Sequence, residues 1–290
     1  MTPLVALASC PLWPAGRGDH AGLVDALAER GVRAEWVPWD DAGASWGAYD
    51  LVVLRETWDY PARLRRFLAW VDAVGAVTTV ANPPAAVRWN HHKGYLADLA
   101  AAGVPVVPTT VVPAGASPEV PGRGRVVVKP AVGIGGDGVF LGRAGDTDTA
   151  AHLEGLLEAG DALVQPFLPS VATAGETSVV MIAGRVTHTV RKRPAGDEFR
   201  VHEHRGGVYA EVDPAPAQRE VARAAGEAAS AITGAELLYA RADLVPGDDG
   251  QPLLMELELI EPSLYLHVVP AATGRVADAV AERVDQGRHT

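Results

Sequence analysis

The segment LLMELELIEP, residues 253–262, places carboxylates inside an apolar run that is otherwise typical of a buried strand. Alternate residues of a strand share a face and rise about 3.3 Å each, so Glu256 and Glu258 point the same way, about 7 Å apart. Two bare negative charges at that distance repel by roughly 2 kcal/mol at an effective dielectric near 20, before desolvation is counted. A bound cation, a basic partner or exposure to water would each compensate them.

The overall composition is that of an ordinary globular chain. It has 290 residues, 48% of them apolar and 21% charged, enough for two or three compact units. The net charge of −11 and the pI near 5.3 argue against a nucleic-acid or anionic-membrane surface, because both need concentrated Lys and Arg. The one cysteine, Cys10, excludes an intramolecular disulfide. We therefore expect a cytoplasmic protein that binds neither nucleic acid nor membrane.

Strand and helix signals alternate over the first ninety residues, which predicts a parallel sheet covered by helices, an α/β unit. The turn after the first strand lacks the spaced glycines of a dinucleotide site. The expected strands are 4–8, 33–37, 49–55 and 77–82, and the expected helices are 23–30 and 62–75.

Beyond residue 113 the strands follow one another closely, with helices set apart from them, which predicts antiparallel α+β lobes. The expected strands are 125–130, 138–142, 162–168, 176–184, 185–193 and 206–212, with helices at 90–102, 147–159 and 216–232 and hairpins at 133–138 and 183–184. We divide the chain into a first domain, 1–88, a central lobe, 89–160, and a C-terminal lobe, 161–290.

The loop GIGGDG, residues 133–138, satisfies the pattern G-x-G-x-x-G. A dinucleotide site would need a helix after this loop, but another strand follows, so that interpretation fails. A glycine-rich flap remains, in which the backbone N–H groups of Gly133, Gly135 and Gly136 approach phosphate oxygens. Lys129, just before the flap, would add a point charge to the same phosphates. The alternative is a flexible hairpin beside a surface lysine.

Taken in chain order, the motifs resemble the ATP-grasp superfamily, in the branch that contains glutathione synthetase and the ribosomal-protein glutamate ligase. The resemblance implies a parallel-sheet first domain followed by two α+β lobes that clamp ATP. The segments LRETWDYPARLRRFLAW and NPPAAVRWNHHKGYL are similar, more narrowly, to a bacterial group likened to the O-ureido-serine cyclo-ligase of cycloserine biosynthesis. The motifs are Lys93 before GYLADLAAAGVPVVPT, VVVKP, GIGGDG, LVQPFLPS, GETS, RVHEHRGG, ARADLV and LMELELIEPS.

The resemblance implies a metal site on the late strands. Such ligases phosphorylate a carboxylate and let an amine attack the acyl phosphate, releasing ADP and phosphate. Asp243 and Glu256 would hold Mg²⁺ at the phosphates, and Glu258 would take the second position of the acidic strand. Many relatives have asparagine at that position, so the extra charge leaves the number of ions, and Mg²⁺ against Mn²⁺, open. Oxygen ligands suit either ion.

The same resemblance assigns the ATP contacts. Lys93 and Lys129 match the two lysines that reach the α- and β-phosphates. Glu176, in GETS, matches a position that often contacts the ribose hydroxyls. The hinge between the lobes, which would bind adenine, contains Gln165, Phe167 and Leu168.

Candidate substrate contacts come from several segments. Arg200 would touch phosphate or acyl phosphate and, with Lys129, serve catalysis. Arg191, with Lys192 and Arg193 beside it, would bind a substrate carboxylate, with a solvated basic face as the alternative. Arg55, Glu56 and Trp58 follow the third strand, where ligands of open α/β sheets bind, and would recognise the amino-acid end. Glu261 falls on the opposite side of the pleat from Glu256 and Glu258 if the strand runs that far, and contact with substrate and capping of the next turn both remain open.

These residues predict an ATP- and Mg²⁺-dependent carboxylate–amine ligase that acts on a small amino-acid-like molecule. The alternatives are an intramolecular cyclo-ligase and a nucleotide-binding protein without turnover; the carboxylates at 243, 256 and 258 count against the latter. A zinc site at His202 and His204 lacks an evident third ligand. The sequence leaves the substrate open, and a homodimer is expected only because relatives often pair.

Overall fold

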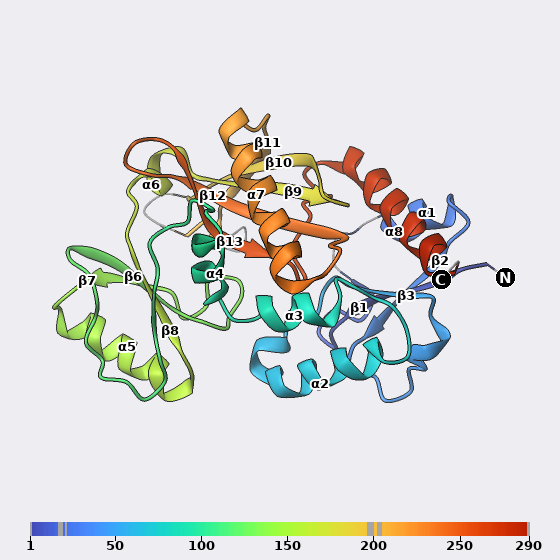
Figure 1. Ribbon diagram of the computed structural model, residues 1–290, viewed down its shortest axis with the longest axis horizontal. Helices are drawn as coiled ribbons and strands as arrows, with labels where there is room; N and C mark the ends of the chain where they lie inside the picture. Colours follow the sequence, from blue (N-terminus) through green and yellow to red (C-terminus); the bar gives the residue numbers. More distant parts are fainter. Residues whose placement is uncertain (1, 17–19, 21, 196–199, 202–204, 289–290) are drawn as a thin grey trace.

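The computed structural model describes residues 2–16, 20, 22–195, 200–201 and 205–288. His202 and His204 of the zinc hypothesis lie outside the described residues. The described strands form three sheets, here called A, B and C. Figure 1 shows sheet A at the lower right, sheet C at the left and sheet B above and between them.

Sheet A is parallel, in the order β2-β1-β3-β4, which confirms the α/β prediction for the start of the chain. Its strands are β1 Leu4–Ser9, β2 Arg33–Pro38, β3 Leu51–Leu54 and β4 Val80–Ala81, with helices α1 Leu23–Ala28 and α2 Leu64–Gly75. The sequence analysis had missed α8, Thr273–Arg288, which returns from the end of the chain to pack beside α1 (Figure 1).

Sheet C is antiparallel, in the order β5-β8-β6-β7, and α5 packs on it through Leu153 and Leu157. The domain boundary expected at residue 160 falls inside this sheet, because β8 pairs with both β5 and β6. Its elements are β5 Thr110–Val112, β6 Arg125–Pro130, β7 Phe140–Arg143, α5 Thr147–Ala159 and β8 Ala162–Pro166.

Sheet B is antiparallel, in the order β11-β10-β9-β12-β13, and its two faces differ in chemistry. Alternate residues such as Val179, Ala242 and Leu257 pack against alanines of α7, whereas the residues between them carry charges toward sheets A and C. The elements are β9 Glu176–Ile182, β10 Arg185–Arg193, β11 Val208–Glu211, α7 Pro216–Thr233, β12 Tyr239–Pro246 and β13 Pro252–Glu258.

Both predicted hairpins are confirmed. Ala183 and Gly184 join β9 to β10 with φ values of 47° and 72°, the left-handed pair that a two-residue turn needs. β6 and β7 are antiparallel partners on either side of the glycine loop. Within that loop Gly135 and Gly136 have φ values of 63° and 74°, which side-chain-bearing residues rarely adopt.

The helix expected at 90–102 begins later than predicted, at Tyr95. The chain forms α3, Pro84–Asn90, and α4, Tyr95–Ala101, with a break between them. Asn90 uses its side chain to bond β13, donating to Leu257 O and accepting from Leu259 N, both at 2.8 Å. Three residues later, the backbone N–H of Lys93 donates to the carbonyl oxygen of Ala131 at 2.8 Å. The break between α3 and α4 accompanies these two sets of bonds.

Two side chains lock sheet A to sheet B. Asn82 Nδ2 donates to the carbonyl oxygens of Tyr239 and Leu259, each at 2.8 Å. The Tyr239 hydroxyl lies 2.8 Å from Leu54 O and 2.9 Å from Ile260 O. These bonds join the carboxyl ends of the parallel strands to the end of β13, so the front domain forms one wall of the charged face of sheet B.

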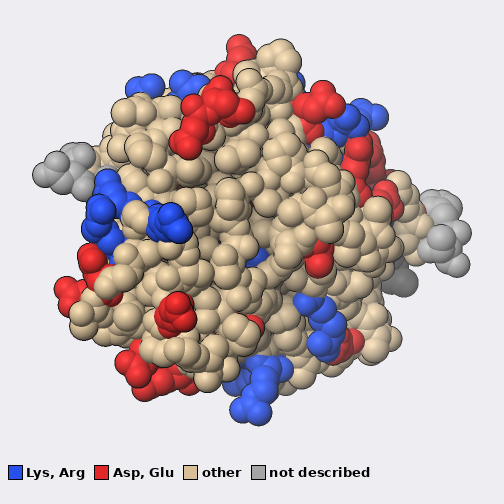
Figure 2. Space-filling view, turned by 60° about the vertical axis from the view of Figure 1, so that its left-hand side comes forward, with Lys and Arg blue, Asp and Glu red and all other residues tan. Residues whose placement is uncertain are grey.

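The remaining described elements are short. None of the described helices combines the length and apolar character needed to cross a membrane. On the face shown in Figure 2, Lys and Arg form small groups interspersed with Asp and Glu, without an extended basic stripe. The short elements are α6 Ser170–Ala174 and the 3-10 turns Trp46–Ala48, Tyr60–Arg63 and Pro270–Ala272.

Candidate functional site

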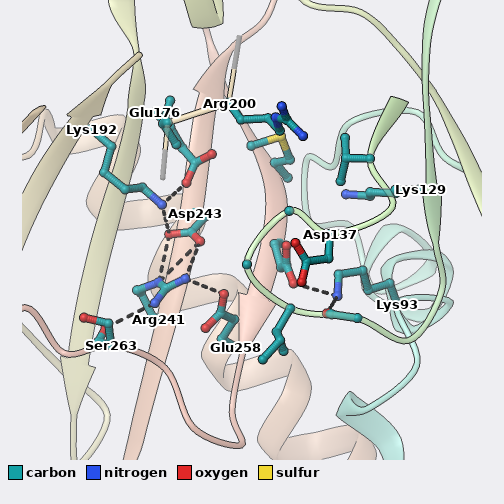
Figure 3. A pocket seen from close by; sticks show the side chains of 18 of the residues that line it. Lys93, Lys129, Asp137, Glu176, Lys192, Arg200, Arg241, Asp243, Glu258 and Ser263 are labelled. Atoms are coloured by element: carbon teal, nitrogen blue, oxygen red, sulfur yellow. Dashed lines mark hydrogen bonds and ion pairs between the residues drawn. The ribbon is translucent and has the colours of Figure 1, made fainter. Parts of the chain in front are cut away.

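A cavity of about 740 Å³ lies between the charged face of sheet B, sheet C and loops of the front domain. The glycine flap and the hinge after β8 line it on one side, and β10, β12 and β13 on the other. The sequence has three lysines, and Lys93, Lys129 and Lys192 all line this cavity. Figure 3 shows Lys93 and Lys129 across the cavity from the charged residues of sheet B.

Asp243, on β12, is the centre of a buried charge network. Arg241 Nη2 donates to its Oδ2 at 2.9 Å, and Lys192 Nζ lies 3.4 Å from its Oδ1 (Figure 3). Lys192 also pairs with Glu176, and Ser178 donates to Asp243. Burial alone would raise the pKa of Asp243, but Arg241 and Lys192 hold it well below its ordinary value. Asp243 is therefore ionised throughout the physiological range.

The carboxylates of β13 are compensated by basic partners, one of the possibilities raised by the sequence. Glu256 lies 3.1 Å from Lys93 Nζ, and Glu258 pairs with Arg241. Burial would raise the pKa of Glu256, but Lys93 and Lys129 lower it. For Glu258, burial outweighs Arg241, and the repulsion from Glu256 adds to it, raising the pKa to about 7.

The predicted metal ligands lie on one face but do not form a cage. Asp243 and Glu256 are register partners across β12 and β13, and Glu258 lies two residues farther along, opposite Arg241. Among the described residues, no group of three acidic, histidine or cysteine side chains is placed to hold a metal ion. The donor chemistry nevertheless fits Mg²⁺, because ionised carboxylate oxygens on neighbouring strands are the ligands it prefers.

The flap and Lys129 face these carboxylates. Gly133, Gly135 and Gly136 line the cavity, and Lys93 Nζ donates to Gly133 O at 2.5 Å. Lys129 is buried, and its ammonium makes no hydrogen bond or ion pair with any described residue. Burial lowers its pKa, with Glu256 opposing the shift. A cation in this position is suited to a multiply charged anion.

The hinge residues meet in the cavity as expected. Gln165, Phe167 and Leu168 all line it. Gln165 Nε2 donates to Thr109 Oγ1 at 2.8 Å, and the Arg125 guanidinium lies 4.0 Å from the centre of the Phe167 ring. These contacts fix an apolar wall beside backbone groups, an arrangement suited to a purine ring. Arg200 also lines the cavity (Figure 3).

Two predicted contacts have other surroundings. Arg191 projects to the α7 face of sheet B, opposite Thr177, so the strand alternation turns it away from the cavity. Its neighbour Lys192 faces the cavity instead. Glu176 lines the cavity, but its carboxylate is paired with Lys192 in the Asp243 network, which counts against a free ribose contact.

Arg55 and Glu56 are fully buried and are not among the residues that line the cavity, contrary to the expected direct substrate contact. Arg55 instead donates to Pro262 O and lies over the Tyr239 ring. These residues form the wall behind the loop that follows β13. Trp58, three residues after Arg55, does line the cavity, and its Nε1 donates to Glu261 O at 3.0 Å.

Glu261 lines the cavity with 7% of its surface exposed. The strand ends at Glu258, so the pleat that would have turned Glu261 to the opposite side does not extend that far. Burial, and then repulsion from Glu258, raise its pKa to about 8. Of the two roles left open by the sequence, the position in the cavity favours contact with a ligand.

The raised pKa gives a stability prediction. Unfolded Glu261 loses its proton near its ordinary pKa of 4.5, whereas folded Glu261 keeps it until about pH 8. The wild-type free energy of unfolding should therefore fall between these pH values relative to that of Glu261→Gln, by at most about 1.4 kcal/mol per pH unit. Urea denaturation from pH 5 to 8 measures the difference. Parallel curves for the two proteins would contradict the prediction.

Sequence reasoning missed Arg241, and it grouped Lys192 with Arg191 and Arg193 without deciding which of the three faces the cavity. Both cavity residues carried a signal in the sequence. Arg241 precedes Asp243 by two positions, which places the two side chains on the same face of one strand. For Lys192 the signal was the scarcity of lysine. The chain has only three lysines among its 25 basic residues, and Lys192 is one of them.

Comparisons with known proteins agree with this geometry. Residues 5–82 match the family described as D-cycloserine synthetase DcsG, N-terminal domain, and residues 116–247 match prokaryotic glutathione synthetase, ATP-grasp domain. The cycloserine biosynthesis protein DcsG of Streptomyces lavendulae is 36% identical over 92% of this chain and 94% of its own length. The chain belongs to the ATP-grasp ligase family.

Solved structures support the same fold for this ATP-grasp ligase. A crystal structure of D-cycloserine synthetase DcsG superimposes with a TM-score of 0.88 and 33% identity, covering 97% of this chain and 99% of the other. The ATP-grasp ligase PsnB, complexed with a precursor variant, Mg and ADP, has a TM-score of 0.68 and 18% identity, with 98% and 99% covered. The expected ATP-grasp fold and ATP-dependent ligase class are confirmed, and a nucleotide-binding protein without turnover is not favoured.

Proposed function

We propose that this ATP-grasp ligase uses Mg²⁺ and ATP to phosphorylate the carboxylate of a small amino-acid-like substrate, whose acyl phosphate then reacts with an amine-type nitrogen. The observation that carries the proposal is the composition of the cavity. Lys93, Lys129 and a flap of backbone N–H groups stand opposite the carboxylates Asp243 and Glu256. Cations and N–H groups bind phosphate, whereas carboxylates need a cation between them and that phosphate.

The chain's own residues would supply positioning and charge neutralisation. Lys129 would bind phosphate oxygens directly, since its ammonium makes no hydrogen bond or ion pair with the described residues. Lys93 would exchange Glu256 for phosphate while the flap closes over the nucleotide. Arg241, at the cavity wall, would stabilise charge on the transferring phosphoryl group or the acyl phosphate. Mg²⁺, held by Asp243 and Glu256 with Glu258 nearby, would neutralise charge on the phosphates.

In the proposed step, a carboxylate oxygen of the substrate attacks the γ-phosphorus and the bond to the ADP oxygen breaks. The nitrogen then attacks the acyl carbon, the bond from that carbon to the phosphate oxygen breaks, and phosphate leaves. The nitrogen loses one proton, so the products are the amide, ADP and phosphate. The roles of Arg200 and of the hinge residues stay predictions.

A second candidate is the intramolecular form of this reaction. The match of residues 5–82 to the DcsG N-terminal domain and the similarity to DcsG along 92% of the chain favour it. In that case the attacking nitrogen belongs to the same molecule as the activated carboxylate. O-ureido-D-serine would be the leading candidate substrate. Product mass separates the two, because cyclisation joins no second molecule.

An ADP-release screen tests the proposed function. The candidates are D- and L-amino acids, O-ureido-D-serine, other O-substituted serines and dipeptides, with products weighed by mass spectrometry. We expect ADP release that requires both a carboxylate-bearing compound and Mg²⁺. Release that continues unchanged with EDTA in excess would contradict the role of the divalent ion.

Glu256→Gln tests the carboxylate that faces Asp243. The amide keeps the size of the side chain but weakens metal ligation, so ADP release should fall by about 100-fold and part of the loss should return at high Mg²⁺ or with Mn²⁺. Glu154→Gln, on the exposed side of α5, is the matched control and should behave as wild type. Glu256→Gln with wild-type turnover at low Mg²⁺ would exclude Glu256 as a ligand.

A further inference from the structure

The cavity contains two ionisable groups that make no hydrogen bond or ion pair with any described residue: the ammonium of Lys129 and the carboxyl group of Glu261. Lys129 belongs to the phosphate end. Glu261 lies beside the front domain, where Trp58 bonds its backbone. The remaining cavity carboxylates have basic partners: Asp137 with Arg205, Glu176 with Lys192, Asp243 and Glu258 with Arg241, and Glu256 with Lys93.

The backbone of Glu261 is held on both sides. Trp58 Nε1 donates to the carbonyl oxygen of Glu261 at 3.0 Å, and Arg55 donates to the carbonyl oxygen of Pro262. The carbonyl oxygen of Ile260, just before it, lies 2.9 Å from the Tyr239 hydroxyl. Glu261 itself is 7% exposed and lines the cavity. The loop therefore presents Glu261 to the cavity.

Two aromatic rings line the same cavity, and Trp58 bonds the backbone of Glu261. Trp13 and Trp58 both line the cavity, and their ring centres are 5.5 Å apart in an edge-to-face arrangement. Indole rings attract cations through their electron-rich faces, and the attraction grows when water is excluded. A carboxylate without a hydrogen bond or ion pair to the described residues, in a cavity that tryptophans also line, is chemically suited to a compact organic cation and unsuited to phosphate.

We propose that Glu261, with Trp13 and Trp58, binds the protonated amino group of the substrate. This inference rests on the proposed function and adds the chemical class of the substrate: an amino acid whose ammonium group lies at the front-domain end while its carboxylate faces the ATP end. The ammonium group would give the buried carboxylate an ion pair, which no described residue provides. An ammonium nitrogen has no free electron pair, so the attacking nitrogen is a different atom.

The test compares pairs of probes that differ only in the ammonium group. D-serine, L-serine and O-ureido-D-serine are each titrated beside the analogue with hydrogen in place of that group, by calorimetry at pH 8.5 with Mg²⁺ and a non-hydrolysable ATP analogue. We expect wild type to bind at least one ammonium-bearing probe tightly, with a preference of about tenfold or more over its partner. Glu261→Gln should lose that preference, and Glu261→Asp should restore part of it.

Controls separate this role from a structural one. Glu261→Gln should bind the ATP analogue with wild-type affinity, and Glu154→Gln should keep the full preference. Trp13→Leu, which leaves the bond from Trp58 to Glu261 intact, should reduce the preference without abolishing it. Calorimetry needs no turnover, so a protein that releases no ADP disproves the proposed function and leaves this comparison readable.

Three outcomes would overturn the inference. The first is a wild type without preference for any ammonium-bearing probe. The second is Glu261→Gln with the preference retained. The third is an equal loss of affinity for both members of a pair, which would indicate a contact to another part of the substrate.

Discussion

Lys129→Met should lose ADP release by about 100- to 1000-fold while the folded protein becomes no less stable. The activity falls because the only cavity lysine without a partner among the described residues is removed from the phosphate end. The stability holds because a buried, unpaired ammonium opposes folding, as its lowered pKa indicates, and methionine fills the space without charge. Steady-state ADP release and thermal unfolding measure the two effects.

Lys129→Arg is the second variant, to be compared with Lys129→Met. It keeps the positive charge but replaces a compact ammonium with a larger planar group, so we expect partial activity and weaker ATP binding. If Lys129→Met turned over at the wild-type rate, Lys129 would have no part in phosphate binding. A Met variant that unfolds far more easily than wild type would contradict the charge argument separately.

Arg241→Met should have the largest effect on stability and abolish detectable ligation. Arg241 bonds Asp243 and pairs with Glu258, and it donates to Ser263 O at 3.2 Å. Removing it leaves two carboxylates in a buried site with one cation fewer. Breaking buried pairs of this kind costs about 3 to 5 kcal/mol. Urea denaturation and the ADP-release assay measure the two losses.

Arg223→Met is the matched control for this loss. Arg223 also pairs with two carboxylates, Glu220 and Glu227, but it lies exposed on α7. Its replacement should leave the urea midpoint and the turnover unchanged, because water already screens those charges. Equal changes in the urea midpoint and in turnover for the two arginine variants would show that the buried charge network contributes no more to stability and activity than the exposed pairs do.

The sequence predicted those parts of the fold in which the local pattern of residues matches the final arrangement of the strands. Alternating strand and helix signals predicted sheet A, and closely spaced strands around glycine turns predicted both hairpins. The break between α3 and α4 was missed because its cause is not local. It depends on bonds from Asn90 to β13, more than 160 residues away.

Part of the candidate site could also be predicted from the sequence. The glycine flap, the lysines Lys93 and Lys129 and the acidic strand meet in one cavity as their order in the chain implied. Arg191 was placed wrongly because three basic residues in a row do not reveal the phase of the pleat, which the neighbouring strands decide. Arg55 was misjudged because burial of a guanidinium depends on the carbonyl groups that surround it, and these come from the far end of the chain.

The transfer of an isotope label tests the central claim most directly. O-ureido-D-serine, or whichever substrate the screen identifies, is labelled with ¹⁸O at the carboxylate, and the phosphate released with ADP is analysed by mass spectrometry. An acyl phosphate requires one labelled oxygen to leave with each phosphate. Unlabelled phosphate would show that the carboxylate never attacked ATP, and would contradict the reaction assigned to this cavity.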